Sequence, residues 1–321
     1  MALTLALSFI LGPALAGTET GEFCPTCPDW TNLEGWLAKK EAYERSQANG
    51  GQQPNVNNNG INTKANIPVE KPAPTYPKAE IVASAGSSFN GRVIIDVRDP
   101  EDYQSGHIPG ARNLYWNDLS SGGSLDPVTA EGILRKAGVN NSDYLLIYGD
   151  EEDEDKGADY VFWALSYLGH ENLSKLNGGV DAAWEVGIRP TTSQSLVGES
   201  NYTVHIVPWL LVDKISLKSI LDQPEVQILD ARDFADYGRS RLNTSIPFEA
   251  EKLYDDLLIK DAATLEELLE RRGLEKDGTQ LVYGTPQAYS LFFGLELMGY
   301  NATLLEGDWW QKTGWAVSNV R

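Results

Sequence analysis

Very little cysteine, histidine and positive charge occurs in this sequence. Its 321 residues include 2 cysteines, 3 histidines, and 26 lysines and arginines against 46 aspartates and glutamates, for a formal net charge of −20. So acidic a surface repels nucleic-acid phosphates and anionic lipid headgroups, and we therefore expect no nucleic-acid partner. Hydrophobic residues still make up 41% of the chain, which is enough to pack folded cores.

Long apolar runs are also scarce. One occurs at the N-terminus, where residues 1–16 end in Ala14-Leu15-Ala16, the small-residue pattern of a signal-peptidase site. The run is too short to span a bilayer comfortably, and no later stretch of about 20 apolar residues follows, so we expect no transmembrane span beyond it. No lysine or arginine precedes the run, which departs from the usual signal peptide. The prediction is a signal peptide over 1–16. The mature protein would then be secreted or extracytoplasmic, and could be associated with the cell surface. The alternative is an uncleaved N-terminal anchor.

Export would expose the asparagine sequons of the chain to glycosylation. The pattern Asn-x-Ser/Thr occurs repeatedly, although it also arises by chance in a sequence with many Asn, Ser and Thr residues. The candidate N-glycosylation sites are Asn140, Asn172, Asn201, Asn243 and Asn301.

Composition divides the chain into segments. After the predicted signal peptide, residues 17–45 contain both cysteines and a stretch of helical character. Residues 46–78 are rich in Asn, Gln, Gly and Pro and have almost no large apolar side chains. Such a stretch cannot bury enough surface to offset its chain entropy, so it is predicted to be a flexible linker. Two folded domains are predicted to follow, over 79–190 and 200–321.

The region of the two predicted domains contains an internal repeat. The block Arg92–Tyr103 (RVIIDVRDPEDY) recurs as Val226–Tyr237 (VQILDARDFADY). A second block, Asp143–Gly149, recurs as Thr279–Gly284, and a third similar block lies near the end of each half. Three matched blocks in the same order, at an offset of about 130 residues, indicate that one structural unit is present twice.

Each repeat alternates short apolar runs with helical patterns. Alternation at this spacing predicts an α/β fold, in which helices cover both faces of a doubly wound parallel sheet and any site lies beyond the carboxyl ends of the strands. The expected strands include Val93–Ile95, Leu145–Tyr148, Ile228–Leu229 and Leu281–Tyr283, and the expected helices include Ala130–Ala137, Ala158–Leu168, Leu265–Arg272 and Gln287–Met298.

The first repeat resembles a rhodanese domain. The resemblance rests on Ile94–Arg98 (IIDVR), Gly106–Ala111 (GHIPGA) and a closing segment, Gly169–Trp184. In the second repeat the triplet Asp230–Arg232 is retained, while Leu242–Pro247 stands where the family has its histidine motif. The resemblance implies two tandem rhodanese-like α/β/α domains, arranged as in the thiosulfate and mercaptopyruvate sulfurtransferases, in which the C-terminal unit alone is catalytic.

The polar residues of these motifs have structural explanations. Asp96 with Arg98, and Asp230 with Arg232, follow buried strands, where an acid and an arginine can fix the next loop by charge-assisted hydrogen bonds. His107 lies in a turn of the kind that Pro and Gly make. We therefore favour structural roles for these residues over ligand binding.

Rhodanese chemistry requires a thiolate after the fourth strand, in a loop whose N–H groups and basic side chains hold an anionic persulfide or thiosulfate. By the resemblance, this position is Gly149 in the first repeat and Gly284 in the second, and glycine cannot act as a nucleophile. Six successive carboxylates (150–155) follow Gly149, and the loop after Gly284 contains no Arg or Lys. The prediction is a pseudoenzyme with no catalytic residue in either repeat.

The two cysteines, Cys24 and Cys27, precede the predicted linker with a C-x-x-C spacing. A c-type haem motif is excluded because Pro28, not His, follows the second cysteine. A closed zinc site would need more ligands, and each of the three histidines lies within a predicted domain. In an oxidising compartment a disulfide, within one chain or between two, is favoured over a redox pair or half a metal site.

The carboxylates over 150–155 allow two interpretations. The first is a solvated loop, which needs no ligand. The second is a Ca²⁺ site formed by Asp150, Asp153 and Asp155, because hard cations prefer carboxylate oxygens. No EF-hand spacing is present, so the expectation is no cofactor and no metal, with Ca²⁺ as the weaker alternative.

Two functional hypotheses follow. The leading one is an exported, catalytically degenerate tandem rhodanese-like protein that acts as a binding or assembly module at the cell envelope. Its partner would be an envelope protein or a second copy of the chain, engaged through the N-terminal segment. The alternative is a sulfurtransferase or sulfur carrier for thiosulfate or persulfide, in which Cys24 or Cys27 reaches the folded domains on the linker.

Overall fold

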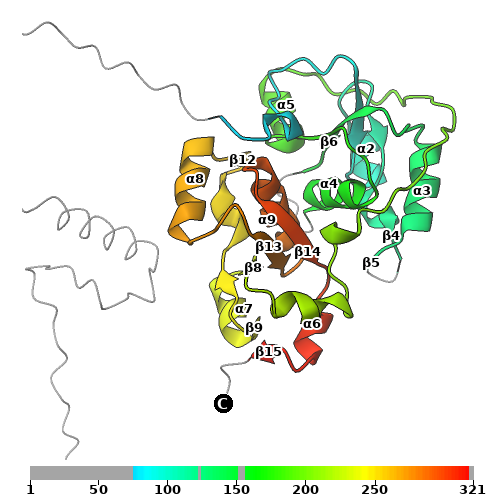
Figure 1. Ribbon diagram of the computed structural model, residues 1–321. Helices are drawn as coiled ribbons and strands as arrows, with labels where there is room; N and C mark the ends of the chain where they lie inside the picture. Colours follow the sequence, from blue (N-terminus) through cyan, green and yellow to red (C-terminus); the bar gives the residue numbers. More distant parts are fainter. Residues whose placement is uncertain (1–74, 122–123, 151–155, 318–321) are drawn as a thin grey trace, which may run out of the picture. The chain divides into compact units, whose positions relative to one another are not determined.

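The computed structural model describes residues 75–121, 124–150 and 156–317. These residues all belong to one compact unit of the chain, residues 71–321. It contains both predicted repeats, called here the first and the second repeat, and each is built around its own parallel sheet (Figure 1). The predicted signal peptide, the cysteine segment and most of the predicted linker lie outside the described residues. No described helix is long and apolar enough to cross a membrane.

The sheet of the first repeat has the strand order β1-β7-β6-β2-β3, with parallel pairing throughout. The two apolar runs predicted as strands form β2 and β6, which pair with each other inside the sheet. Their side chains are buried because helices cover both faces of a parallel sheet. The strands are β1 (Val82–Ala83), β2 (Arg92–Asp96), β3 (Arg112–Asn113), β6 (Tyr144–Tyr148) and β7 (Leu173–Leu176).

The sheet of the second repeat has the order β10-β8-β13-β14, also with parallel pairing. Strand for strand it repeats β3-β2-β6-β7, so the internal repeat found in the sequence corresponds to a repeated topology. This confirms the predicted α/β fold with parallel sheets. The strands are β8 (Val226–Asp230), β10 (Ile246–Pro247), β13 (Thr279–Tyr283) and β14 (Asn301–Leu305).

Aspartate side chains cap the starts of several helices. Asp99 accepts a hydrogen bond from a backbone N–H in the first turn of α2, Asp126 does so for α3, and Asp261 for α8. These caps place each helix start directly after a loop. The helices are α2 (Pro100–Ser105), α3 (Pro127–Lys136), α4 (Gly157–Tyr167), α5 (Gly179–Glu185), α6 (Ser216–Leu221), α7 (Phe234–Arg239), α8 (Ala262–Arg271) and α9 (Gln287–Leu297).

Short 3₁₀ helices and two-stranded antiparallel ribbons connect these elements. The 3₁₀ helices are η1 (Ala79–Ile81), η2 (Trp116–Leu119), η3 (Pro208–Leu210), η4 (Ala250–Leu253) and η5 (Trp309–Lys312). The ribbons pair β4 (Ser120–Ser121) with β5 (Ser124–Leu125), β11 (Tyr254–Asp255) with β12 (Leu258–Ile259), and β15 (Ala316–Val317) with β9 (Arg241–Leu242).

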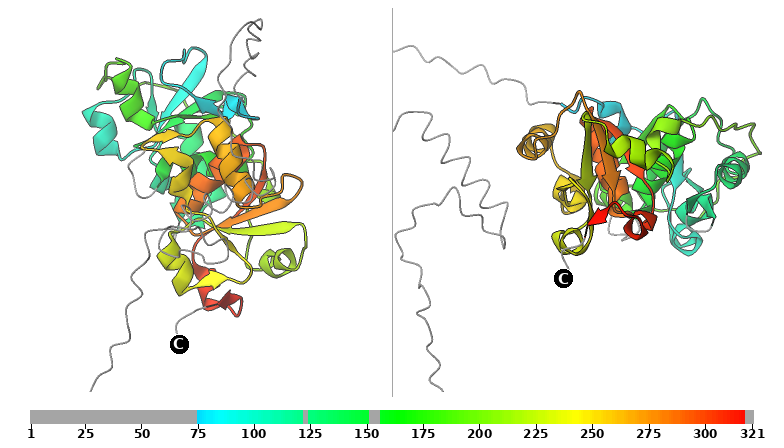
Figure 2. Two further views of the ribbon diagram at one scale, coloured as in Figure 1. Left: turned by 90° about the vertical axis from the view of Figure 1, so that its left-hand side faces the viewer. Right: turned by 60° about the horizontal axis from the view of Figure 1, so that its bottom comes forward.

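Helices α4 and α9 join the two repeats. Both are apolar on nearly all sides, which is the pattern of a helix enclosed by protein. Between them, the rings of Phe162 and Phe293 meet edge to face with centroids 5.0 Å apart, as do those of Tyr160 and Tyr289 at 5.0 Å. Figures 1 and 2 show the two helices side by side between the sheets. One buried apolar cluster therefore runs through both repeats.

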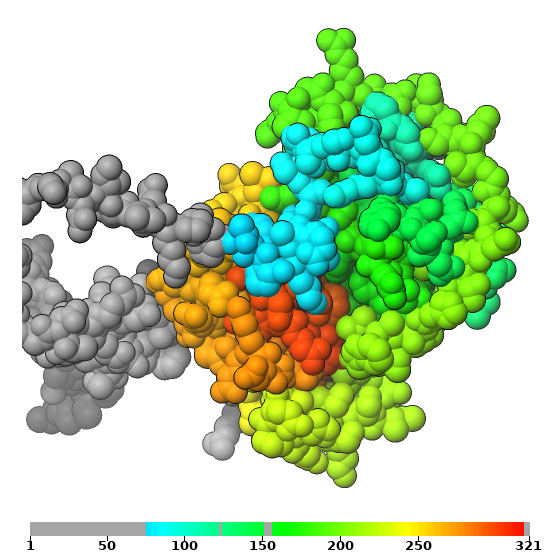
Figure 3. Space-filling model, turned by 45° about the horizontal axis from the view of Figure 1, so that its top comes forward, coloured from blue at the N-terminus to red at the C-terminus, as the bar shows by residue number. Residues whose placement is uncertain are grey.

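The start of the described chain lies on the second repeat (Figure 3). The Tyr76 hydroxyl donates a hydrogen bond to the Lys260 carbonyl at 2.7 Å, and the Lys78 ammonium pairs with Glu296 at 2.5 Å. The last residues of the linker predicted over 46–78 are therefore part of the folded unit. Its polar and proline-rich composition gave no indication of this contact.

The segment between the repeats packs on the first of them. Arg135 Nε donates to the Tyr202 carbonyl at 2.8 Å, and the fully buried Tyr202 ring stacks on His170 with centroids 5.8 Å apart. The Val204 N–H donates to Glu131 at 2.9 Å. The start of the domain predicted over 200–321 thus belongs in space to the first repeat, since a short alternating segment does not reveal which sheet it will contact.

A buried group of charged and polar side chains crosses the junction. Lys175 on β7 lies 2.8 Å from Asp159 on α4, with side chains only 2% and 4% exposed. Ser290 on α9, from the second repeat, donates its hydroxyl to the other Asp159 oxygen at 2.5 Å. The Lys175 ammonium also lies 4.7 Å from the centroid of the Phe293 ring. The ion pair is thus enclosed by both repeats.

Removing one partner of this pair should destabilise the whole unit. In Lys175→Met, Asp159 is left as a buried carboxylate without its cation, and we expect a loss of about 3–5 kcal/mol in the free energy of unfolding. The double variant Lys175→Met/Asp159→Asn should be much less affected, because no unpaired charge remains. Urea unfolding measures both.

Lys276 provides the matched control, since it pairs with Glu266 at 2.8 Å where both side chains are over a third exposed. Lys276→Met should change the free energy of unfolding by no more than about 0.5 kcal/mol. Equal losses in Lys175→Met and Lys276→Met would show that the junction does not depend on the buried pair.

Candidate functional site

A fully buried aspartate ends the central strand β2 of the first repeat. At Oδ1, Asp96 accepts hydrogen bonds from the backbone N–H and the Nε of Arg98, each at 3.0 Å. At Oδ2 it accepts from Arg98 Nη2 at 2.7 Å and from the Tyr148 hydroxyl at 2.6 Å. Arg98 Nη2 also donates to the Gly106 carbonyl at 2.8 Å. The arginine thereby fixes the far end of the loop that contains α2.

The same arrangement recurs at the end of β8 in the second repeat. Asp230 accepts from the N–H, Nε and Nη2 of Arg232 at 3.1, 2.9 and 2.6 Å, and Nη2 also donates to the Ser240 carbonyl at 2.6 Å. The tyrosine differs in its partner, since the Tyr283 hydroxyl donates to Ser245 Oγ at 2.9 Å. Each repeat thus places an arginine, held by a buried carboxylate, beside the end of the next strand of its sheet.

Both tyrosines remain neutral donors. Burial first, and then the negative charge of the neighbouring aspartate, raise the pKa of Tyr148 and of Tyr283 well above the ordinary value. These hydroxyls therefore serve to satisfy buried oxygens, and neither can act as a base near neutral pH.

Glycine follows each of these tyrosines. Gly284 has a left-handed backbone, with φ of +92°, and a Cβ built there would lie 2.5 Å from Arg232 Cγ. Gly149 is less restricted, because a Cβ would lie 3.2 Å from Val97 Cγ2 and 3.3 Å from Ala158 Cβ. In the second repeat, the arginine side chain therefore occupies the space that a side chain at position 284 would need.

A cavity of about 360 Å³ opens beside Gly284. Two arginines line it: Arg232, whose guanidinium lies 5.1 Å from the centroid of Trp310, and Arg239, whose side chain is 72% exposed and pairs with Asp236 at 2.6 Å. The complete lining is Arg232, Asp236, Arg239, Ser240, Gly284, Thr285, Gly307, Asp308, Trp310 and Gln311.

The sequence alone does not reveal that these two arginines lie together. The loop after Gly284 has no Arg or Lys, and from this we inferred that no cationic side chain would hold an anion there. The structure brings two arginines, Arg232 and Arg239, to the cavity from the segment that follows β8, where Asp236 and Asp308 also line it. The repeat of the triplet Asp230–Arg232 was the one feature of the sequence that could have indicated it.

The acidic loop of the first repeat lies largely outside the described residues. Asp150 is exposed, whereas Asp153 and Asp155 are not described. Within the described ranges, no group of three or more His, Cys, Asp and Glu side chains is placed to hold a metal ion. Cys24 and Cys27 also lie outside the described residues.

His107 is fully buried in the first repeat. Its Nδ1 lies 2.7 Å from the Tyr103 carbonyl oxygen and its Nε2 lies 3.1 Å from the Ser193 carbonyl oxygen, while its ring stacks on Tyr103. These contacts hold the segment after α5 against the turn at Ile108–Gly110. They leave the imidazole enclosed by protein atoms.

The candidate glycosylation sites lie at the surface to different degrees. Most of their asparagines are exposed, whereas Asn172 is half-buried. The Asn301 amide donates to Thr279 Oγ1 at 3.1 Å, and the Asn140 amide lies 3.3 Å from Asp143. The exposed asparagines are Asn140, Asn201, Asn243 and Asn301.

Comparison with known proteins agrees with this architecture. Residues 83–185 match the family model of the rhodanese-like domain. The chain is 29% identical over 248 residues to a protein assigned as a thiosulfate sulfurtransferase in Haloferax volcanii, covering 68% of this chain and 83% of that protein. It is 25% identical over 242 residues to the sulfur carrier protein TtuD of Thermus thermophilus, covering 64% of this chain and 82% of that protein.

Solved structures identify the fold. SseA of Escherichia coli, a 3-mercaptopyruvate sulfotransferase, matches with a TM-score of 0.63 at 22% identity, covering 71% of this chain and 98% of SseA. An anaerobic ergothioneine biosynthesis enzyme of Chlorobium limicola matches with a TM-score of 0.65 at 18% identity, covering 74% and 69%. The fold is therefore the rhodanese-like α/β fold, as the sequence predicted.

Adding a side chain at position 284 should be costly. In Gly284→Ala, the left-handed backbone and the clash with Arg232 should together reduce the free energy of unfolding by about 1–3 kcal/mol. Gly238→Ala is the control, because a Cβ added there would meet no atom within 4 Å beyond its chain neighbours and its own helix backbone; it should stabilise α7 slightly or leave it unchanged. Urea unfolding distinguishes these results. A Gly284→Ala variant as stable as the wild type would show that Arg232 does not occupy this space.

Proposed function

We propose that this protein carries or transfers sulfane sulfur. The premise is that residues 83–185 match the rhodanese-like domain and that the described unit has the rhodanese-like fold. The relatives with the broadest similarity support this choice, since they include a protein assigned as a thiosulfate sulfurtransferase and a sulfur carrier protein. They favour sulfur chemistry over the binding module that we first preferred from the sequence.

The cavity beside Gly284 is the site that carries the proposal. Arg232 and Arg239 line it together, and guanidinium groups recognise oxyanions through charge-assisted hydrogen bonds. Arg232 is fixed by its bonds to Asp230, whereas the exposed Arg239 is free to turn toward a ligand at the cost of its surface pair with Asp236. A small sulfur-containing anion, of which thiosulfate is the simplest, fits this chemistry.

The thiol must come from Cys24 or Cys27, because the sequence contains no other cysteine. The thiolate attacks the outer sulfur of thiosulfate, the S–S bond of thiosulfate breaks, and sulfite leaves with the bonding electron pair. The product is a cysteine persulfide. An acceptor such as cyanide then attacks the outer persulfide sulfur, giving thiocyanate and regenerating the thiolate. A flexible linker of about 30 residues has an r.m.s. span of roughly 30 Å, which is compatible with such a delivery.

One observation favours a second function, the exported binding or assembly module. Both strand-end positions are glycines, and at Gly284 the arginine fills the space of the missing side chain. Sulfur transfer requires a nucleophile, whereas binding does not. A folded unit without its own nucleophile could still bind an envelope protein or a second copy of the chain through residues 17–45. In an oxidising compartment a disulfide between Cys24 and Cys27 would also block persulfide formation.

A thiosulfate:cyanide assay on the full-length protein, with and without prior reduction, tests the first proposal. We expect thiocyanate formation after reduction, falling to the blank rate in Cys24→Ser/Cys27→Ser. Arg239→Gln should raise the KM for thiosulfate about tenfold, since one charge-assisted contact is lost. Arg271→Gln, which removes an exposed arginine paired with Glu267 on α8, should leave the KM unchanged.

The outcomes separate the two functions. Turnover that survives the double cysteine substitution would contradict the assigned thiols. No turnover in reduced wild-type protein would contradict sulfur transfer and leave the binding module as the function. A normal KM in Arg239→Gln would show that the anion binds elsewhere.

A further inference from the structure

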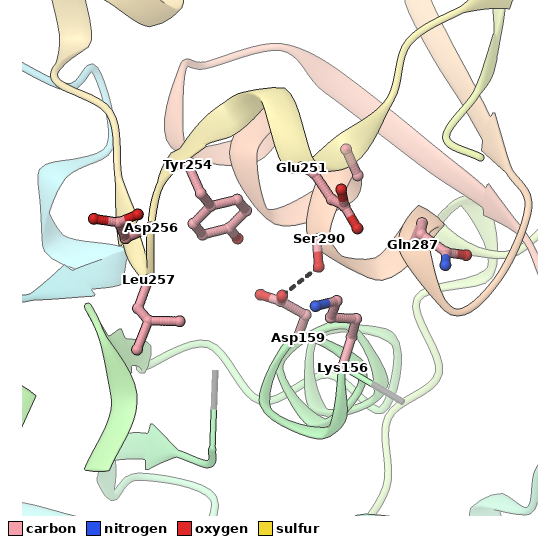
Figure 4. Close-up of a pocket in the computed structure, with 9 residues that line it drawn as sticks. Lys156, Asp159, Glu251, Tyr254, Asp256, Leu257, Gln287 and Ser290 are labelled. Carbon is pink, nitrogen blue, oxygen red and sulfur yellow. Dashed lines mark hydrogen bonds between the residues drawn. The ribbon is translucent and has the colours of Figure 1, made fainter. Parts of the chain in front are cut away.

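A second cavity, of about 240 Å³, lies where the two repeats meet, and both contribute to its wall (Figure 4). From the first repeat, Lys156 and Asp159 reach it at the start of α4. From the second repeat, Ser290 on α9 and the segment from η4 to β12 enclose it, with Glu251, Tyr254 and Leu257 among its side chains. The anion site proposed above has a different lining, so the two cavities are separate.

One side of this cavity is polar but electrically neutral. Asp159 bonds to Lys175 with one oxygen and accepts from Ser290 with the other, at 2.8 and 2.5 Å. Lys175 also donates to the Tyr254 hydroxyl at 3.4 Å. Because Asp159 and Lys175 neutralise each other and their side chains are nearly fully buried, this side supplies a fixed surface and no net charge for a ligand.

Three further charged side chains line the cavity: Lys156 from the first repeat, and Glu251 and Asp256 from the second. Figure 4 shows the Lys156 ammonium beside Asp159, and the Glu251 carboxylate on the opposite wall beyond Ser290. Among the described residues, neither Lys156 nor Glu251 forms an ion pair with another side chain. Figure 4 shows Leu257 near Asp256, at the other end of the cavity from Glu251.

We propose that this junction cavity binds a small zwitterion of the α-amino-acid class. The ligand's ammonium group pairs with Glu251 and its carboxylate pairs with Lys156, while Asp256 adds a second negative charge at the other end of the cavity. The volume agrees with so small a ligand, since sites for drug-sized molecules measure roughly 300–1,000 Å³. A ligand with a single charge would satisfy one wall and leave the other charge without a partner.

The proposal has a consequence for the junction. A zwitterion bound here connects the first repeat to the second through two charge-assisted contacts, so it stabilises the folded unit by binding to it and not to the unfolded chain. The effect rests on this cavity alone and is independent of whether the protein transfers sulfur.

Thermal unfolding of the full-length protein with matched ligands tests the inference. The probes are glycine, alanine, serine and reduced cysteine. The matched controls are ethanolamine, which is serine without its carboxylate, and glycerate, which is serine with a hydroxyl in place of its ammonium group. We expect at least one of the four amino acids, at ten times its Kd, to raise the Tm by about 3 °C. Ethanolamine and glycerate at the same concentration should give no rise.

Charge-removing variants locate the site. Lys156→Met and Glu251→Gln should each abolish the ligand-dependent rise in Tm, read against the Tm of the same variant without ligand. Lys276→Met and Glu267→Gln remove exposed charges elsewhere and should retain it, as should Arg239→Gln in the other cavity. No rise with any of the four amino acids would overturn the proposal. An equal rise with ethanolamine or glycerate, or a rise that persists in both cavity variants, would overturn it as well.

Discussion

Asp96 and Asp230 are fully buried carboxylates, and a buried carboxylate is tolerated only where cations and hydrogen-bond donors surround it. In each repeat an arginine two positions later meets this requirement, and in the first repeat the Tyr148 hydroxyl from the neighbouring strand is a further donor. The arginine cannot leave without exposing the carboxylate to an apolar core. Its position, and hence the shape of the site at the strand ends, follows from that constraint.

The constraint acts differently in the two repeats. In the second, Arg232 passes directly over Gly284, so the strand can continue only as a glycine with a left-handed backbone. In the first, Gly149 is bordered by Val97 and Ala158 at ordinary to tight distances. The same residue therefore follows the strand in both repeats, although the space for a side chain there differs. An added Cβ would clash at Gly284, whereas at Gly149 it would make tight contacts.

Much of this architecture could be predicted because its causes are local. The alternation of apolar runs and helical patterns gave the strands and the long helices, and the repeated blocks gave the tandem topology. The predicted helix over Ala158–Leu168, for example, differs from α4 by one residue at each end. Apolar periodicity specifies such elements because a parallel sheet and its helices bury them on all sides.

The contacts between segments distant in the sequence could not be predicted in this way. Arg239 reaches the cavity beside Gly284 from another loop, and Tyr202 packs on the first repeat although it was assigned to the second domain. The sequence does contain a signal of the buried ion pair. Lys175 lies in an apolar strand and Asp159 in an apolar helix, and a charged side chain in such a place needs a partner. The sequence shows that need, but only the packing of α4 on α9 shows which residue meets it.

A shared core and a buried ion pair make the two repeats one body, and this limits how the protein can perform sulfur chemistry. An enzyme with a resident cysteine fixes the distance between nucleophile and anion site by folding. Here the proposed anion site belongs to the folded unit, while both cysteines lie before the predicted linker. The rate of persulfide formation would then depend on the effective concentration of a tethered thiol, which linker length sets and which is millimolar for short flexible linkers. The proposed delivery requires that the cavity beside Gly284 be open to solvent, and the side chain of Arg239, which lines it, is exposed.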